Sequence, residues 1–370
     1  MVKRNRNGEN KEHLDSYREA INGIDSQILS LLTRRQEVAI AVGQIKKESG
    51  LEIFDPAREK EILRRLTSTS HGVLSGEAVK HIYNEIISAS RAVQEPLTVA
   101  YFGPEATFSH QATLFLFGHS ASMRAAETIE DVFSLVEKGI CQQGVVPIEN
   151  SYEGSVNKTL DLLYKYELKI SSEISLRIRH HLLSRADDIK NIKHLYSHYM
   201  AFAQCRAWIK GNVPKSVAIK EVGSTSLAAK LAAEDPEAAA VGSSLAAQTY
   251  GLNMLQENIE DHPDNVTRFL SIGKTDHEPT GKDKTSILFF LNHKPGALYN
   301  ALGILAKNNI NMTRIESRPM RIRNWEYLFF VDIEGHQKDN DVHKTIAEME
   351  KTCPFVKRLG SYPAAGDPRA

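Results

Sequence analysis

The sequence predicts a multidomain chain in which an all-α segment is followed by an α/β domain and then by a smaller α+β domain. Residues 14–94 show only the three- and four-residue apolar spacing of helices, whereas from Leu97 short β-rich runs such as LTVAYF and GVVPI alternate with helical stretches. The last stretch, of about 80 residues, has the order β-α-β-β-α-β of the ferredoxin-like split βαβ fold. Polar breaks at QEP and TDHEPTGKDKT separate three predicted domains, at residues 12–95, 97–274 and 285–362.

The composition excludes several classes of function. Lysine plus arginine (46) equals aspartate plus glutamate (46), so no net charge draws the chain to nucleic acid or to an anionic membrane. No stretch is apolar enough to span a bilayer, and MVKRNRNGENKEHLD lacks the apolar run of a signal peptide. Cys141, Cys205 and Cys353 are scattered and suggest neither disulfides nor a metal site. We therefore expect a soluble, cytoplasmic protein that uses no metal or cofactor.

Three helices are predicted in the first domain, at residues 14–48, 56–68 and 77–95. Asp55-Pro56 marks the start of the second helix with an N-cap and a first-turn proline. The first helix has apolar residues every three or four positions, which is the repeat of a helix that packs on others. We call this row the apolar seam, and it consists of Leu14, Tyr17, Ile21, Ile24, Ile28, Leu31, Val38, Val42 and Ile45.

Arg35 falls on the next position of the apolar seam, where an unpaired guanidinium is costly. In one interpretation it pairs with Glu59 of the second helix. In the other, Arg18, Arg35 and Lys46 border a site whose counter-charge arrives with a small dicarboxylate. Arg18 lies roughly 25 Å from Arg35 along the helix axis, at about 1.5 Å per residue, so a second, antiparallel copy of the helix would have to supply it. This interpretation predicts a dimer with shared sites.

The first domain resembles the all-helical chorismate mutase domain over its whole length, in Arg18-Glu19, RRQE, GQIK, DPAREKEIL and the spaced Ser90 and Gln94. The resemblance implies that carboxylates are bound by Arg18 (from a second subunit), Arg35 and Arg58. It implies that the ether oxygen of chorismate is faced by Lys46 and Gln94. The remaining implied pocket residues are Asp55, Glu59 and Ser90. A pericyclic rearrangement needs no nucleophile or metal, but it needs a compact substrate conformer and cations near the breaking C–O bond.

The α/β domain has three hydroxyl-rich turns between strand ends and helices, at 103–110, 147–159 and 223–229. Helix N-termini can bind carboxylates or phosphates, although each hydroxyl taken alone is better explained as an ordinary N-cap. Three such turns in one domain suggest a lined cleft. His194 and His198 are four residues apart, but HLYSH is typical of a strand end and not of a helix, so we expect no metal there. Cys205 lies in the apolar run AFAQCRAWI, which indicates a buried helix face and not a nucleophile.

Residues 97–274 resemble prephenate dehydratase in VVPIEN, in YSH followed by AQC, in the STS turn and in NVTRF at 265–269. The resemblance implies two α/β lobes, as in periplasmic binding proteins, with the site between them and Thr267 essential to catalysis. The other implied pocket residues are Glu149, Asn150, Ser197, His198 and Gln204. The reaction expels the ring hydroxyl and carbon dioxide together, and the Thr267 hydroxyl can orient a hydrogen bond to that leaving group. Tyr199-Met200 replaces the usual Pro-Gln of this family, so the shape of that loop is not implied.

Six elements are predicted in the C-terminal domain. The strands are SILFFL, NMTRI, WEYLFFVDIE and FVKRL, and the helices are residues 298–307 and 341–351. We expect the final PAAGDPRA to be a frayed tail. The domain resembles the amino-acid-binding ACT domain of phenylalanine-regulated dehydratases in HKPGALYNAL and ESRP. The resemblance implies a phenylalanine site at a subunit interface and feedback inhibition through a ligand-stabilised, less active arrangement. The alternative is a plain dimerisation module. The implied site residues are Gly296, Ala297, Leu298, Glu316 and Ser317.

Taken in order, the three resemblances imply a bifunctional enzyme that converts chorismate through prephenate to phenylpyruvate, under control by L-phenylalanine. We expect a homodimer or a higher homo-oligomer, with neither nucleic acid nor a membrane as partner. Two alternatives remain open. One is a dehydratase that prefers arogenate, the aminated analogue of prephenate. The other is a small-molecule sensor that has lost its chemistry and would release no phenylpyruvate from chorismate.

Overall fold

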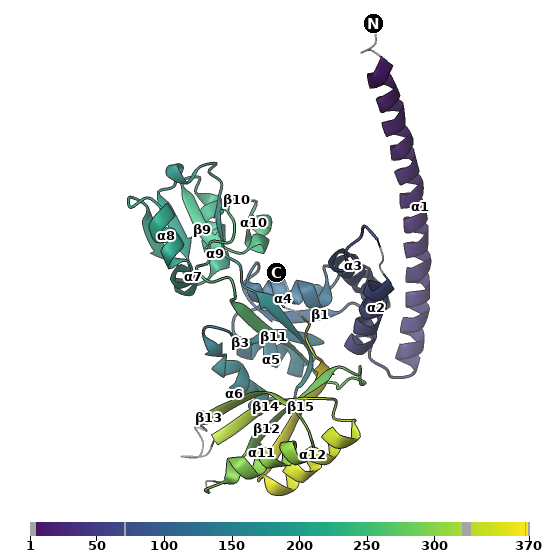
Figure 1. Ribbon diagram of the computed structural model, residues 1–370, viewed down its shortest axis with the longest axis vertical. Coiled ribbons are helices and arrows are strands. Elements are labelled where there is room, and N and C mark those ends of the chain that lie inside the picture. The colour runs from purple at the N-terminus through teal and green to yellow at the C-terminus, as the bar shows by residue number, and fades with distance from the viewer. Residues whose placement is uncertain (1–4, 70–71, 293, 320–326, 367, 369–370) are drawn as a thin grey trace.

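The computed structural model describes residues 5–69, 72–292, 294–319, 327–366 and 368. A helical domain, a two-lobed α/β domain and a C-terminal α+β domain follow one another along the chain, which confirms the predicted fold class (Figure 1). None of the helices in the described ranges has the length and apolar character needed to cross a bilayer. His293 of the HKPGAL motif, and Trp325 and Glu326 of the predicted WEYLFFVDIE strand, lie outside the described residues.

The helical domain consists of α1 (Asn5–Glu48), α2 (Pro56–Thr69) and α3 (Gly76–Gln94). The last two are close to prediction, whereas α1 begins at Asn5 and not at the predicted residue 14. Both α1 and α2 pack on α3. The approach of α1 to α3 is so close at Gly43 that an added Cβ would lie 2.7 Å from Gln94 Cγ, so this crossing requires glycine. The first half of α1 extends away from the rest of the molecule (Figure 1).

The first lobe is a six-stranded sheet of order β2-β1-β3-β11-β5, with β4 paired to β3, covered by helices. Its central strand β3 contains the continuous apolar run VVPI and is buried, as expected of a strand covered on both faces. The elements of this lobe are β1 (Thr98–Phe102), α4 (Phe108–Phe117), β2 (Ser122–Ala126), α5 (Ile129–Glu137), β3 (Gln143–Asn150), β4 (Gly154–Ser155), α6 (Asn157–Lys165), β5 (Lys169–Arg177) and β11 (Val266–Gly273).

The second lobe is a five-stranded sheet of order β10-β6-β9-β7-β8, inserted between β5 and β11. The chain therefore crosses twice between the lobes, once after β5 and once before β11. The elements of the second lobe are β6 (His181–Ser184), a 3-10 turn η1 (Ile189–Asn191), β7 (His194–Ser197), α7 (Tyr199–Gln204), α8 (Arg206–Asn212), β8 (Ala218–Glu221), α9 (Thr225–Glu234), β9 (Ala238–Gly242), α10 (Ser244–Tyr250) and β10 (Asn253–Gln256).

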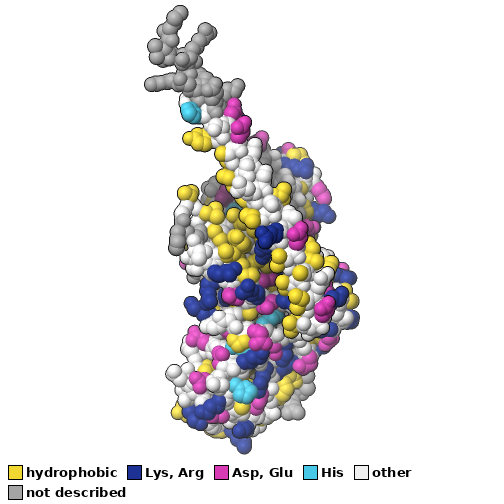
Figure 2. Space-filling view, turned by 90° about the vertical axis from the view of Figure 1, so that its right-hand side faces the viewer, with side chains coloured by type: hydrophobic (Ala, Val, Ile, Leu, Met, Phe, Trp, Pro, Cys, Tyr) yellow, Lys and Arg dark blue, Asp and Glu magenta, His cyan; other side chains and the backbone are white. Residues whose placement is uncertain are grey.

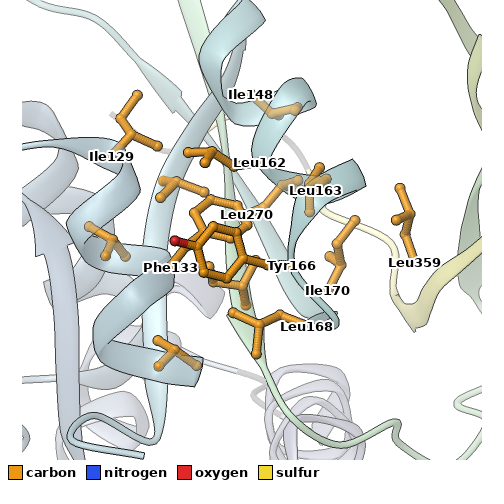
Figure 3. Packing of buried hydrophobic residues seen from close by; sticks show 14 of the residues in the cluster. Ile129, Phe133, Ile148, Leu162, Leu163, Tyr166, Leu168, Ile170, Leu270 and Leu359 are labelled. Carbon is orange, nitrogen blue, oxygen red and sulfur yellow. The ribbon is translucent and has the colours of Figure 1, made fainter. Parts of the chain in front are cut away.

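The C-terminal domain has the predicted order β-α-β-β-α-β, with an antiparallel sheet of order β13-β14-β12-β15. One face of this sheet packs on the two helices of the domain. The other face joins the core of the first lobe, where Leu359 lies near Leu163 and Ile170 (Figure 3). The elements are β12 (Asp283–Phe290), α11 (Ala297–Lys307), β13 (Met312–Pro319), β14 (Tyr327–Glu334), α12 (Asn340–Thr352) and β15 (Phe355–Pro363).

The polar break before β12 and the end of the chain are both packed against the domains. His277 is only 8% exposed, and its ring centroid lies 6.0 Å from that of Phe54, in the turn between α1 and α2. The backbone N–H of Ala365 donates to Glu173 Oε1 at 2.6 Å. The prediction of a frayed tail is therefore wrong for residues 363–365, because β15 carries the chain end back over the first lobe, where buried Glu173 accepts this bond.

Candidate functional sites

Arg35 has no acidic partner among the described residues. Its Nη1 donates to Ser90 Oγ and, at 3.5 Å, to the carbonyl of Ile86 on α3. Glu59, its predicted partner, instead forms an ion pair with Arg91, with 3.2 Å between Oε1 and Nε. The interpretation in which Arg35 pairs with Glu59 is therefore wrong. The half-buried Arg35 guanidinium is left with neutral partners, which suits it to an anion from outside the chain.

Around Glu59 the helical domain gathers charges of both signs. Burial raises the pKa of Glu59, Arg91 opposes that shift, Asp55 adds to it and Lys46 opposes it. Lys46 Nζ donates to two backbone carbonyls of the turn after α1, at 3.1 Å each, which fixes its ammonium group beside α2. Gln94 Nε2 donates to the carbonyl of Ser90 at 2.9 Å, so its amide is held on the same side of α3.

One of the predicted residues serves as an N-cap, and two others are not assembled at this place in a single chain. Asp55 caps α2, as one interpretation expected, because its Oδ1 accepts from the backbone N–H of Arg58 at 3.0 Å. The Arg58 side chain is exposed and pairs with Glu61 at 2.6 Å. Arg18 is exposed near the far end of α1, where it pairs with Asp15 at 3.1 Å. One chain thus provides only part of the predicted pocket.

The apolar seam of α1 is uncovered in the single chain. Tyr17 is 69% exposed and Ile45 is 62% exposed, and the other members of the apolar seam are exposed as well. Hydrophobic side chains gather along α1 and the surface beside it (Figure 2). Continuous exposed apolar surface of this kind is typical of a protein–protein interface.

The second candidate site is a chain of hydrogen bonds that joins the two lobes. Asn150 on β3 and Thr267 on β11 are cross-strand neighbours, and Asn150 Nδ2 donates to Thr267 Oγ1 at 2.8 Å. Asn150 Nδ2 also donates to Asn265 Oδ1 at 2.8 Å, and Asn265 Nδ2 donates to Gln204 Oε1 on α7 at 3.0 Å. Because Thr267 Oγ1 accepts the bond from Asn150, its own proton is available for another acceptor.

The sequence reasoning missed two residues of this chain of bonds. Asn265 is only 2% exposed and lies two residues before Thr267, the spacing that places side chains on one face of an extended segment. That spacing within NVTRF could have identified it. His180 Nε2 lies 2.8 Å from Gln204 Oε1, and burial lowers the pKa of His180, which favours its neutral form. It lies on the crossing after β5, and no sequence pattern marked it.

Two predicted pocket residues of the second lobe bond to that lobe itself. Ser197 is fully buried and its Oγ donates to the carbonyl of Val241 at 2.8 Å. His198 Nδ1 accepts from the backbone N–H of Met200 at 3.4 Å and caps α7.

Cys205 is buried, and burial raises the pKa of its thiol well above the usual range, as expected of an unreactive cysteine. Among the described residues, no group of His, Cys, Asp and Glu is suited to hold a metal ion.

Glu149, another predicted pocket residue, has its carboxylate on the C-terminal domain. Its Oε2 lies 2.9 Å from Nε of Arg314 on β13. Ser155 on β4 accepts from Arg314 Nη2 at 2.7 Å and donates to Glu316 Oε2 at 2.8 Å. Strand β13 is therefore bonded to the same end of β3 that carries Asn150.

The predicted effector residues lie at the start of α11 and on the two faces of β13. Gly296 has φ +78° at the start of α11, a left-handed conformation that favours glycine, as the predicted tight turn requires. Ser317 pairs with Phe329, whose side chain faces the helices, whereas Glu316 pairs with Phe330, whose side chain faces the first lobe. Adjacent strand residues point to opposite faces, so Glu316 and Ser317 lie on opposite faces of β13 in the single chain. Their place beside one ligand at a subunit interface stays a prediction.

Arg268, the residue after Thr267, points into the junction with the C-terminal domain. Its guanidinium lies 2.6 Å from Glu173 Oε2 and 2.5 Å from Asp332 Oδ2, and it donates to the Tyr362 hydroxyl at 3.0 Å. An arginine that is only partly exposed and has two carboxylate partners is strongly held in place. Strand β11 thus has Thr267 at the candidate site and Arg268 at the junction with the C-terminal domain.

Comparison with known proteins matches three successive parts of the chain to three families. Residues 17–95 match the family chorismate mutase type II, residues 99–277 match prephenate dehydratase, and residues 285–350 match the ACT domain. A protein of Aquifex aeolicus (strain VF5) named bifunctional chorismate mutase/prephenate dehydratase is 48% identical over 358 residues, which cover 96% of this chain and 99% of the relative.

Two solved structures resemble the larger part of the chain. Prephenate dehydratase from Arthrobacter aurescens, in complex with L-Phe, is 34% identical with a TM-score of 0.67, and the match covers 74% of this chain and 92% of that one. The quorum-quenching acylase GqqA is 30% identical with a TM-score of 0.66, and the match covers 72% of this chain and 98% of that one. From the three family matches and the near full-length identity, the chain belongs to the family of bifunctional chorismate mutase/prephenate dehydratases.

Proposed function

We propose that this chain rearranges chorismate to prephenate in its helical domain and converts prephenate to phenylpyruvate between its two lobes. The observation that supports the proposal is that each of the two domains has a polar side chain available to bind a substrate. Arg35 has no acidic partner among the described residues, and the Thr267 hydroxyl has its proton free. Because an acylase shares much of this fold, the reactions are assigned from these residues and not from the fold.

The rearrangement requires that a flexible dicarboxylate be held compactly while negative charge builds on the breaking C–O bond. Arg35 is placed to bind a carboxylate, and Ser90 orients its guanidinium. Lys46 and Gln94 lie on the neighbouring parts of α1 and α3 as donors for the ether oxygen. Fixed donors of this kind stabilise the transition state because they need no reorganisation as the charge develops.

A second copy of the chain completes this site in our proposal. The apolar seam of α1 is exposed and is long enough to cover an antiparallel α1 of another subunit. In that arrangement Arg18 of each subunit reaches the Arg35 of the other. The homodimer and a cytoplasmic location both stay predictions, which size measurement and fractionation of cells would check.

For the dehydration, Thr267 donates a hydrogen bond to the ring hydroxyl as it leaves. The acidity of a threonine hydroxyl is slight, so its contribution is to orient the leaving group and to stabilise developing charge. Asn150 holds the threonine oxygen, and Asn265 and Gln204 extend the bonded chain to the second lobe. Closure of the lobes around prephenate would exclude water and favour loss of carbon dioxide.

L-Phenylalanine is the proposed effector, bound near Gly296 on the C-terminal domain. The relative from Arthrobacter aurescens was solved in complex with L-Phe. Three bonded pairs, Arg314–Glu149, Glu316–Ser155 and Arg318–Asp161, connect β13 to the first lobe beside the dehydratase site. A ligand that prefers one position of β13 therefore changes the balance between active and less active arrangements.

The proposal is tested by incubating the full-length protein with chorismate, prephenate or arogenate, each with and without L-phenylalanine, and by quantifying the products. Phenylpyruvate from both chorismate and prephenate, reduced by phenylalanine, is the expected result. Turnover of arogenate in preference to prephenate would change the substrate assignment. Failure to release any product would identify a sensor and contradict both proposed activities.

A further inference from the structure

Arg91 lies beside the mutase site but outside the set of residues that the family resemblance assigns. It follows Ser90 on α3 and is only 5% exposed. Its guanidinium carbon lies 5.4 Å from the ring centroid of Phe54 and 5.5 Å from that of Phe117. A buried guanidinium in contact with two aromatic rings is stabilised by cation–π attraction and can move little.

The anchor of Arg91 belongs to the dehydratase domain. Arg91 Nη2 donates to the carbonyl of Phe117, the last residue of α4, at 2.7 Å. Two further contacts join α3 to the segment after α4. The backbone N–H of Ser120 donates to Ser88 Oγ at 3.2 Å, and Glu85 lies 2.9 Å from His119. Helix α3 is therefore attached to the dehydratase domain along one side.

The opposite side of Arg91 meets Glu59 of the mutase site. Arg91 Nε lies 3.2 Å from Glu59 Oε1, an ion pair without the alignment of a hydrogen bond. Within the described ranges, neither Nε nor Nη1 of Arg91 has a hydrogen-bond acceptor, and Glu59 is the only carboxylate paired with this guanidinium. The charge of Arg91 is thus balanced mainly by Glu59, so each of the two groups restricts the other.

We propose that Arg91 is a positioning residue for the mutase reaction, through which the dehydratase domain holds the Glu59 carboxylate in place. The inference rests on the proposed mutase function of this site. It gives the contact between the two domains a role, because the anchor for one active site is a backbone carbonyl of the other domain.

The charges around Glu59 give the proposal a pH signature. They come from Lys46 on α1, Asp55 before α2 and Arg91 on α3. Burial and Asp55 raise the pKa of Glu59, while Arg91 and Lys46 lower it. Without the guanidinium, Glu59 would take up a proton at higher pH and change from a pure acceptor into a donor. The acid limb of the mutase pH–rate profile would then move to higher pH.

The test compares full-length wild type, Arg91→Met, Arg91→Lys and Glu85→Gln. Mutase kcat/KM is measured against pH, and dehydration of added prephenate is measured on the same samples. Arg91→Met is expected to lose mutase kcat/KM roughly tenfold or more near neutral pH, since small misplacements are costly, and to shift the acid limb upward. Arg91→Lys keeps the charge and should restore the acid limb. Glu85→Gln alters the same domain contact without touching Glu59 and should match wild type.

Each outcome has one meaning. Arg91→Met with the rate and pH profile of wild type overturns the inference. If Arg91→Met loses dehydration activity as well, the substitution has disturbed the fold. The inference is then judged on Arg91→Lys. A folded Arg91→Lys with an upward-shifted acid limb would contradict a role for the charge, whereas a restored limb with a lower rate would support it. A wild type without mutase activity would defeat the proposed function itself.

Discussion

Asn150 and Thr267 face each other across β3 and β11, and the amide of Asn150 donates to the hydroxyl oxygen of Thr267 at 2.8 Å. This bond occupies one of the two acceptor lone pairs of the hydroxyl. The Thr267 proton is not used in the bond, so it stays available for donation to a ligand. That direction of donation is the one needed to assist a leaving hydroxyl group.

Thr267→Ala is expected to lower prephenate dehydration by roughly a hundredfold or more, the usual contribution of a positioned proton donor. Mutase activity should be unchanged, because Thr267 lies in another domain. The measurement is phenylpyruvate release from added prephenate, alongside chorismate consumption. Thr267→Ser keeps a hydroxyl and should retain much of the rate. An unaffected dehydration rate in the alanine variant would remove Thr267 from the site.

Arg35→Ala should show the reverse pattern. Loss of the guanidinium removes a carboxylate contact and a donor near the developing charge, so mutase kcat/KM is expected to fall roughly 10²- to 10³-fold. Prephenate turnover should stay at the wild-type level. Arg34→Ala is the matched control, because Arg34 has the same charge at the adjacent, exposed position of α1. Equal mutase rates in both variants would show that the Arg35 site is wrongly assigned.

Shared sites in a dimer can be tested by mixing two inactive variants. Arg18→Ala and Arg35→Ala should each lack mutase activity, but a hybrid dimer would have one site with Arg35 from one subunit and Arg18 from the other. After exchange of subunits, the mixture should recover roughly a quarter of wild-type activity, because half of randomly paired dimers are hybrids with one intact site. Absence of recovery, with exchange confirmed by mass measurement of tagged subunits, would contradict a shared site.

The sequence predicted the elements well but not the pairing of charges across them. Because apolar spacing follows directly from helix and strand geometry, periodicity placed the elements of the helical and C-terminal domains within a few residues, except that α1 begins at Asn5 and not at residue 14. It could not tell that Glu59 meets Arg91 and not Arg35, since that choice depends on how α2 crosses α3. Likewise the bonds of Glu149 and Glu316 depend on the docking of two domains, which no local pattern records.

Asp161 offers a test of how the effector domain acts on the dehydratase site. Arg318 of β13 bonds both carboxylate oxygens of Asp161 on α6, at 2.9 and 2.8 Å, and Asp161 is not one of the predicted dehydratase residues. Asp161→Asn should leave the uninhibited dehydration rate unchanged and alter the phenylalanine concentration for half-inhibition by up to about fivefold, the range expected of a partly exposed ion pair. Lys158 lies on the same helix as Asp161 and forms an exposed ion pair with Glu130 of α5. Lys158→Gln breaks that pair and should have no effect on inhibition. If both variants are inhibited like wild type, the Arg318–Asp161 contact does not transmit the effector signal. The Arg314–Glu149 and Glu316–Ser155 pairs would then be the next contacts of β13 to test.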